Sequence, residues 1–231
     1  MYNLILLSAK PLPLEQPGCC QWMAFDGGSF LFGGPRAKDV AHFAADGTPL
    51  DDICCENRYA CLCYDAAEDC FWGIPSHTLA LHQLDRELCV TGRFYPLGEE
   101  KGQICSISCT DSEIVLYTQN AIHLLAKPPK AAASWNNPPG IYACCGCILE
   151  GNIHIVCRSY VAASFSPIAI CEEDLAPVNM ACLPAGLYAR SACAAYDPQN
   201  QPHLFVLASR SHQQHFLLNY LLYDAREELC L

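Results

Sequence analysis

The sequence is poor in positive charge. Its 231 residues include 13 lysines and arginines against 24 aspartates and glutamates, which gives a formal net charge of -11. A chain with this balance repels a phosphate backbone over most of its surface. We therefore expect no nucleic-acid partner.

Long apolar runs are also missing. The longest, near residues 141–149 and 216–223, fall well short of the roughly 20 residues that span a membrane. The first three residues carry no positive side chain, and the apolar stretch Leu4 to Leu7 is too short for a secretory leader. These observations predict no membrane partner and a cytoplasmic location.

Motifs that fix a reaction are absent. The chain has no G-x-S-x-G elbow, no phosphate-binding glycine loop and no dinucleotide fingerprint. No C-x-x-C knuckle occurs either, although structural zinc sites usually need one. We expect no cofactor and no metal.

What the sequence does contain is a repeat. Five segments each combine a run of small residues, a turn with Asp, Gly or Asn, and a run of larger apolar residues. They begin at Gln21 (QWMAFDGGSFLFGG), Tyr59 (YACLCYDAAEDCFWGI), Gln103 (QICSISCTDSEIVLYT), Tyr142 (YACCGCILEGNIHIVC) and Ala189 (ARSACAAYDPQNQPHLFVL). Their spacing of 38 to 47 residues is close to that of a four-stranded propeller blade.

The second half of the unit repeats as strand, polar turn, strand. It is present in 41–53, where Asp46-Gly47 is a strong hairpin signal, in 79–92 and in 220–231. In the third unit, the segment KPPKAAASWNNPPG (127–140) favours a fourth strand only poorly. The opening strand, Asn3 to Ser8, lies outside the units, and we expect it to pair with the last one and close a ring.

Small side chains fill the first strand of each unit. Strands that converge on one axis need small side chains, so this gradient favours a propeller over a sandwich. The pattern resembles propeller repeats of the NHL or YVTN kind from Gln21 to Leu231. We predict an all-β, five-bladed β-propeller forming one domain, 1–231, with blades near 21–56, 57–100, 101–139, 140–186 and 187–231. A sandwich or an incomplete ring is the alternative.

The 18 cysteines and the repeated histidines each allow two interpretations. Cys61 and Cys63, like the pair Cys105 and Cys109, have spacings that could serve a metal ion. They also fall on inner strands that need small residues, so we interpret the cysteines as reduced core residues in a reducing compartment. His42, His82 and His123 recur on third strands, too far from the axis to meet.

Aspartates recur where the first strand turns into the second. They are Asp26, Asp65, Asp111 and Asp197. Turn aspartates commonly accept hydrogen bonds from the backbone two residues on, which explains the repetition. The alternative is a hydrolase acting on glycans through paired axial carboxylates.

Charge is distributed unevenly between the two faces of the predicted ring. The "turn face" carries the connections between strands one and two and between strands three and four. The "loop face" carries the connections between strands two and three and between blades. Acids dominate the turn face, and the bases placed on the loop face are Arg36, Lys38, Arg58, Arg93, Lys101, Arg158, Arg190 and Arg210.

This distribution predicts a binding site on the loop face. The leading hypothesis is a non-catalytic binding or scaffold propeller that holds a protein segment or an anionic small molecule. The candidate ligand-binding residues are Arg36, Arg58, His77, Lys101, Trp135, Arg158 and Arg210. No catalytic residue is predicted.

Overall fold

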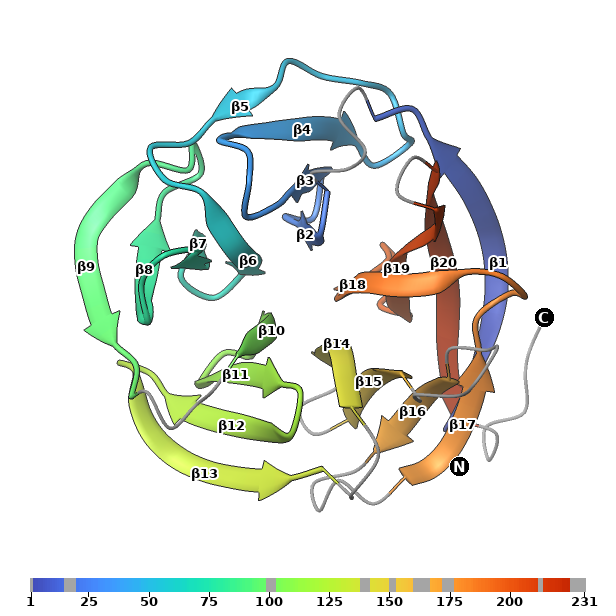
Figure 1. Cartoon of the computed structure of the whole chain (residues 1–231). Helices are drawn as coiled ribbons and strands as arrows, with labels where there is room; N and C mark the ends of the chain where they lie inside the picture. The colour runs from blue at the N-terminus through green and yellow to red at the C-terminus, as the bar shows by residue number, and fades with distance from the viewer. Residues whose placement is uncertain are drawn as a thin grey trace.

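The computed structural model is a ring of five antiparallel sheets around a central axis (Figure 1). It describes residues 2–14, 20–98, 103–137, 142–149, 153–159, 167–171, 177–211 and 214–224. No helix in these ranges is long and apolar enough to cross a membrane.

Each sheet has four strands and forms one blade. Blade 1 comprises β2 (Trp22–Phe25), β3 (Ser29–Gly33), β4 (Asp39–Ala44) and β5 (Ile53–Cys54). Blade 2 comprises β6 (Tyr59–Asp65), β7 (Cys70–Pro75), β8 (Ala80–Leu84) and β9 (Val90–Pro96). Blade 3 comprises β10 (Ile104–Cys109), β11 (Glu113–Thr118), β12 (Ala121–Ala126) and β13 (Lys130–Asn136). Blade 4 comprises β14 (Tyr142–Leu149), β15 (Ile153–Ser159), β16 (Pro167–Cys171) and β17 (Pro177–Cys182). Blade 5 comprises β18 (Tyr188–Tyr196), β19 (Pro202–Ser211), β20 (Gln214–Asp224) and β1 (Tyr2–Leu12).

The two ends of the chain close the ring. β1 pairs antiparallel with β20, in a register that runs from Tyr2 opposite Asp224 to Leu12 opposite His215. Blade 5 therefore takes three strands from the C-terminal part of the chain and its outer strand from the N-terminal part (Figure 1). The predicted five-bladed propeller, with a ring closed near the termini, is confirmed.

Residue size follows the position of a strand within its blade. The inner strands β2, β6, β10, β14 and β18 surround the axis (Figure 1). Four of them are rich in Ala, Ser and Cys, whereas β2 has the sequence WMAF and only Ala24 is small. The second strands lie between neighbours on both sides and against adjacent blades on both faces. They are accordingly continuous apolar runs, and every residue of β3 and β7 is buried.

The hydrophobic core is divided among the five seams between blades. Trp22 and Leu31 of blade 1 pack on Phe71 and Leu84 of blade 2, and the other four seams each have a cluster of their own. Polar bonds also cross the seams: Ser106 Oγ donates to the Gly146 carbonyl at 2.8 Å. Each blade is thus held mainly by its two neighbours.

Two strand expectations differ from the structure. The segment after Lys127 does supply a fourth strand, β13, whose small side chains form an exposed outer edge that needs little packing. In blade 5, β1 lies beside β20 in the place that the pattern assigned to 225–231, which are outside the described residues. The repeat pattern predicts that blade 5 has a fourth strand, but it does not identify which end of the chain provides that strand.

Candidate functional site

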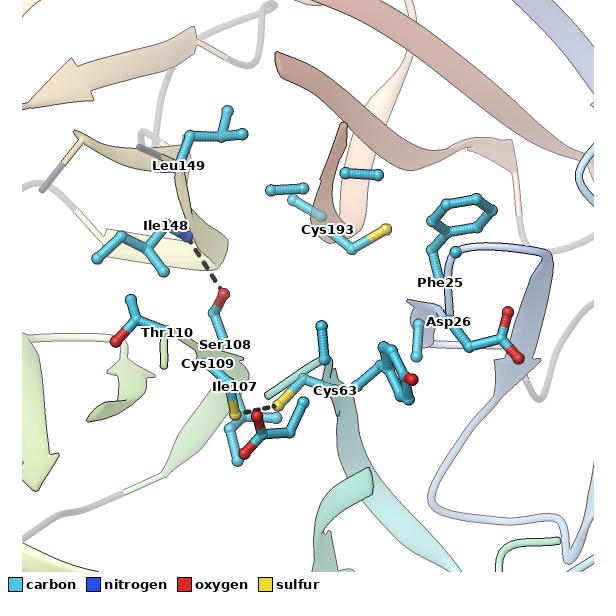
Figure 2. Close-up of a pocket in the computed structure, with 18 of the residues that line it drawn as sticks. Phe25, Asp26, Cys63, Ile107, Ser108, Cys109, Thr110, Ile148, Leu149 and Cys193 are labelled. Carbon is cyan, nitrogen blue, oxygen red and sulfur yellow. Dashed lines mark hydrogen bonds between the residues drawn. The ribbon is translucent and has the colours of Figure 1, made fainter. Parts of the chain in front are cut away.

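A cavity of about 780 Å³ lies on the axis at the turn face. The ends of all five inner strands line it, and Figure 2 shows Phe25, Cys63, Ser108, Ile148 and Cys193 around it. The sequence pattern pointed to the opposite face and did not predict this cavity.

The cavity has an acidic lining. Asp26, Asp65, Asp111 and Glu113 contribute to it, and no Lys, Arg or His side chain does among the described residues. An anion would therefore be repelled here.

Most of the recurring turn aspartates accept hydrogen bonds from their own turns. Asp26 Oδ1 accepts from the backbone N–H groups of Gly28 and Ser29 at 2.9 and 2.7 Å. Asp197 Oδ1 accepts from those of Gln199 and Gln201 at 2.9 and 2.7 Å. The capping interpretation accounts for these carboxylates.

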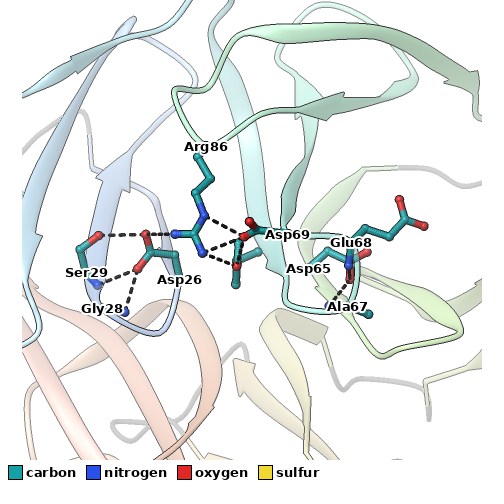
Figure 3. A network of polar contacts seen from close by, with 9 residues as sticks. Asp26, Gly28, Ser29, Asp65, Ala67, Glu68, Asp69 and Arg86 are labelled. Carbon is teal, nitrogen blue, oxygen red and sulfur yellow. Dashed lines mark hydrogen bonds and ion pairs between the residues drawn. The ribbon is translucent and has the colours of Figure 1, made fainter.

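Arg86 joins the turn-face carboxylates of blades 1 and 2 (Figure 3). Its Nε donates to Asp69 Oδ1 at 2.7 Å, and its Nη1 lies 3.5 Å from Asp26 Oδ2. The Tyr64 hydroxyl donates to Asp69 as well, at 2.5 Å, and accepts from Arg86 Nη2 at 2.7 Å. Hydrogen bonds from Tyr64 and Arg86 lower the pKa of Asp69. Burial and the Asp69 carboxylate raise the pKa of Tyr64 to about 12.

Asp65 forms a buried ion pair across the seam between blades 2 and 3. Its side chain is 1% exposed and pairs with Lys127, which is 7% exposed. Asp65 Oδ2 also accepts from Trp72 Nε1 at 2.9 Å, and Oδ1 accepts from the backbone N–H groups of Ala67 and Glu68. Lys127 Nζ donates further to the Thr110 carbonyl at 2.6 Å. This carboxylate is committed to holding two blades together.

One group of metal-ligating atoms occurs near this ion pair. Ligand atoms of Asp65, Glu68 and Cys70 lie within 4.8 Å of one another. Gln83 Nε2 already donates to Glu68 Oε2 at 2.7 Å and to Cys70 Sγ at 3.4 Å. A cation here would have to displace N–H donors from all three ligands, so the group is better understood as a hydrogen-bonded structural cluster.

The histidines of the third strands are separate, and each contacts residues of its own blade. His42 Nε2 lies 2.8 Å from Ser29 Oγ, and His123 Nδ1 lies 2.9 Å from Ser134 Oγ. The His82 ring stands edge-on to Phe94, with ring centroids 4.7 Å apart. These contacts agree with a packing role for each ring.

The loop-face candidates are distributed over several blades. Arg36 lies in the β3–β4 connection, Arg58 before β6 and His77 in the β7–β8 connection, and all three are exposed. Trp135 is half-buried on the outer strand β13. Arg210, near the end of β19, places its guanidinium 5.6 Å from the centre of the Phe216 ring.

Two of the candidate ligand-binding residues lie partly or wholly outside the described part of the chain. Lys101 is outside the described residues, and for Arg158 only the backbone, in β15 opposite Ala143, is described.

Arg93 was expected on the loop face but lines a hollow with Glu68 and Lys127, which are turn-face residues. The expectation for Arg93 was wrong because the residue lies within β9, where the direction of a side chain follows strand geometry and not the nearest connection.

The cavity also holds a thiol pair that sequence reasoning did not single out. Cys63 Sγ of β6 lies 3.1 Å from Cys109 Sγ of β10, across the seam between blades 2 and 3 (Figure 2). A sequence signal for this pair did exist. Each cysteine precedes a recurring turn aspartate, Asp65 or Asp111, by two residues, which places both at the same height on neighbouring inner strands.

No protein-family model matches the sequence, and no curated protein matches it either. Solved structures do resemble it. A tail fiber of Staphylococcus aureus phage P68 is similar with a TM-score of 0.65 at 7% identity, over 97% of this chain and 53% of that one. Kuenenia stuttgartiensis hydrazine synthase is similar with a TM-score of 0.53 at 10% identity, over 92% of this chain and 64% of that one. The chain thus spans less than two thirds of the length of each. At these identities the likeness concerns the fold alone: the chain is a five-bladed β-propeller.

Proposed function

We propose that this chain is a non-catalytic binding or scaffold propeller whose loop face holds a protein segment or an anionic small molecule. The compartment we propose is the cytoplasm. The 16 described cysteines are free thiols, most of them buried, as suits a reducing environment.

One observation carries the proposal: the two faces differ in how their charges are paired. Every ion pair or histidine–carboxylate contact between described residues lies on the turn face and involves Arg86, Lys127 or His203. On the loop face, Arg36 and Arg58 are exposed and have no carboxylate within 4.0 Å among the described residues. An unpaired guanidinium presents N–H donors in a fork that fits carboxylate and phosphate oxygens.

A glycan hydrolase has less support. Such an enzyme needs two carboxyl groups that are available to substrate on opposite sides of the scissile bond. Of the four acids at the axial cavity, Asp65 is buried in an ion pair, and Asp26 is bonded to its turn, to Ser29 and to Arg86. These two carboxylates would have to break those bonds before they could act on a sugar.

The test uses two defined anions, a fluorescent octaglutamate peptide and inorganic pyrophosphate. The variant Arg36→Ala/Arg58→Ala should bind whichever probe the wild type binds at least about 10-fold more weakly, which corresponds to roughly 1.4 kcal/mol. Its unfolding temperature should stay unchanged because both side chains are exposed and unpaired. Binding by the wild type should weaken as salt rises.

A charge-matched control separates local binding from net charge. The variant Lys10→Ala/Lys130→Ala removes two exposed positive charges from β1 and β13 and should bind as the wild type does. If both variants bound the probe equally weakly, the effect would come from overall charge and not from a site on the loop face. Failure of the wild type to bind either probe would overturn the proposal.

A further inference from the structure

The thiol pair at the mouth of the axial cavity differs from the other cysteines in its surroundings. The sulfur atoms of Cys63 and Cys109 are 3.1 Å apart and come from different blades. Both line the cavity, so a small molecule that enters from the turn face reaches them. By contrast, Cys145 and Cys157, which are opposite each other in blade 4, are both fully buried.

We propose that Cys63 and Cys109 form a reversible thiol–disulfide exchange site, which small-molecule disulfides such as oxidised glutathione convert to a disulfide between blades 2 and 3. To reach a disulfide bond length of about 2.05 Å, the sulfurs must approach by roughly 1 Å. The contact already lies between packed inner strands, so a side-chain movement of this size suffices. The site is independent of the binding function proposed above.

The exchange has two steps. The Cys109 thiol loses its proton, and its sulfur attacks one sulfur of oxidised glutathione, which breaks the glutathione disulfide and releases one glutathione thiolate. The Cys63 thiol then loses its proton and attacks the Cys109 sulfur, which forms the protein disulfide and releases the second glutathione. The two cysteines lose two electrons and two protons, and the glutathione disulfide gains them as two thiols.

Burial assigns the two roles. Cys63 is 8% exposed, whereas Cys109 is half-buried and therefore meets the reagent first. Burial and the hydrogen bond with Cys109 raise the pKa of Cys63, which disfavours Cys63 as the first thiol to attack. Cys63 thus acts as the resolving thiol.

The experiment incubates the folded, reduced protein with oxidised glutathione and alkylates the remaining thiols. We expect Cys63 and Cys109 to escape alkylation, a link between tryptic peptides 59–86 and 102–130, and full reversal by dithiothreitol. Each peptide contains other cysteines, so the fragment spectrum of the linked pair must assign the bond to Cys63 and Cys109. A link through Cys61 or Cys105 would overturn the proposal, as would no link at all.

Variants test the assigned roles. Cys63→Ser should stop at a stable glutathione adduct on Cys109, while Cys109→Ser should form neither an adduct nor a link at Cys63. Cys193→Ser is the matched control, since Cys193 lines the same cavity from β18 and should leave the link unchanged. A Cys193→Ser variant that loses the link would refute the pairing. If one of these cysteine variants fails to fold, the fragment spectrum of the linked wild-type peptides still decides whether Cys63 and Cys109 are joined.

Discussion

Replacing Asp65 with asparagine should destabilise the propeller strongly. Asp65 is 1% exposed and pairs with Lys127, while its oxygens also accept hydrogen bonds from Trp72 Nε1 and from two backbone N–H groups. Asp65→Asn removes the negative charge. If the amide oxygen keeps the hydrogen bonds from the turn, the new NH₂ group faces two other donors, Trp72 Nε1 and Lys127 Nζ. Removing one partner of a buried ion pair typically costs about 3 to 5 kcal/mol, since the other charge stays buried. For a chain of this size that corresponds to a fall in unfolding temperature of roughly 6 to 20 °C.

The matched control is Asp85→Asn in the β8–β9 turn. Asp85 Oδ1 accepts one bond, from the Cys89 backbone N–H at 2.8 Å, and the contact is exposed, so we expect a loss of only about 0.5 to 1.5 kcal/mol. Urea unfolding followed by tryptophan fluorescence measures both variants. Combining Asp65→Asn with Lys127→Met should restore part of the loss, because no uncompensated charge remains. Equal stability of Asp65→Asn and Asp85→Asn would refute the reasoning.

Three further predictions concern acid, packing and thiols. Burial lowers the pKa of His154 from 6.5 to about 4, so the unfolded chain binds a proton at this imidazole more readily than the folded chain does. The protein should therefore lose about 2 kcal/mol through this group as pH falls from 7 to 5, and His154→Gln should flatten the pH profile of urea unfolding. Gly33→Ala would place a Cβ in steric overlap with the Trp22 ring and should cost about 1 to 3 kcal/mol, while Gly28→Ala, whose nearest contact is 3.8 Å away, should cost under about 0.5 kcal/mol; equal losses would contradict this. Dithiothreitol should leave the unfolding temperature of purified protein unchanged within about 2 °C, whereas a framework of structural disulfides would lose about 2 to 5 kcal/mol on reduction.

Much of the fold could be predicted because a propeller repeats its local pattern. Runs such as Phe30-Leu31-Phe32 alternate with small inner strands at a regular spacing, and each blade contacts mainly its neighbours. The closing strand near the N-terminus was also predicted, since a strand outside the units had no other partner. β13 was underestimated because an outer strand carries little apolar signal.

The candidate site was harder to predict. The capping role of Asp26 and Asp197 follows from turn chemistry alone, and the structure bears it out. The cavity, the Arg86 bridge and the Cys63–Cys109 contact depend on how closely neighbouring blades approach. Local pattern does not fix that distance. The loop-face site remains a prediction.

The sequence by itself determined where most strands lie, which strand of each unit is innermost and which side of the ring is acidic. These properties follow from side-chain size, alternation and turn residues within about 45 residues of chain. Only the tertiary structure decided where the axial cavity opens, that Asp65 is buried against Lys127 and that two thiols meet across a seam. The physical reason is that each of these features joins different blades, so it depends on the angle and distance at which whole sheets pack.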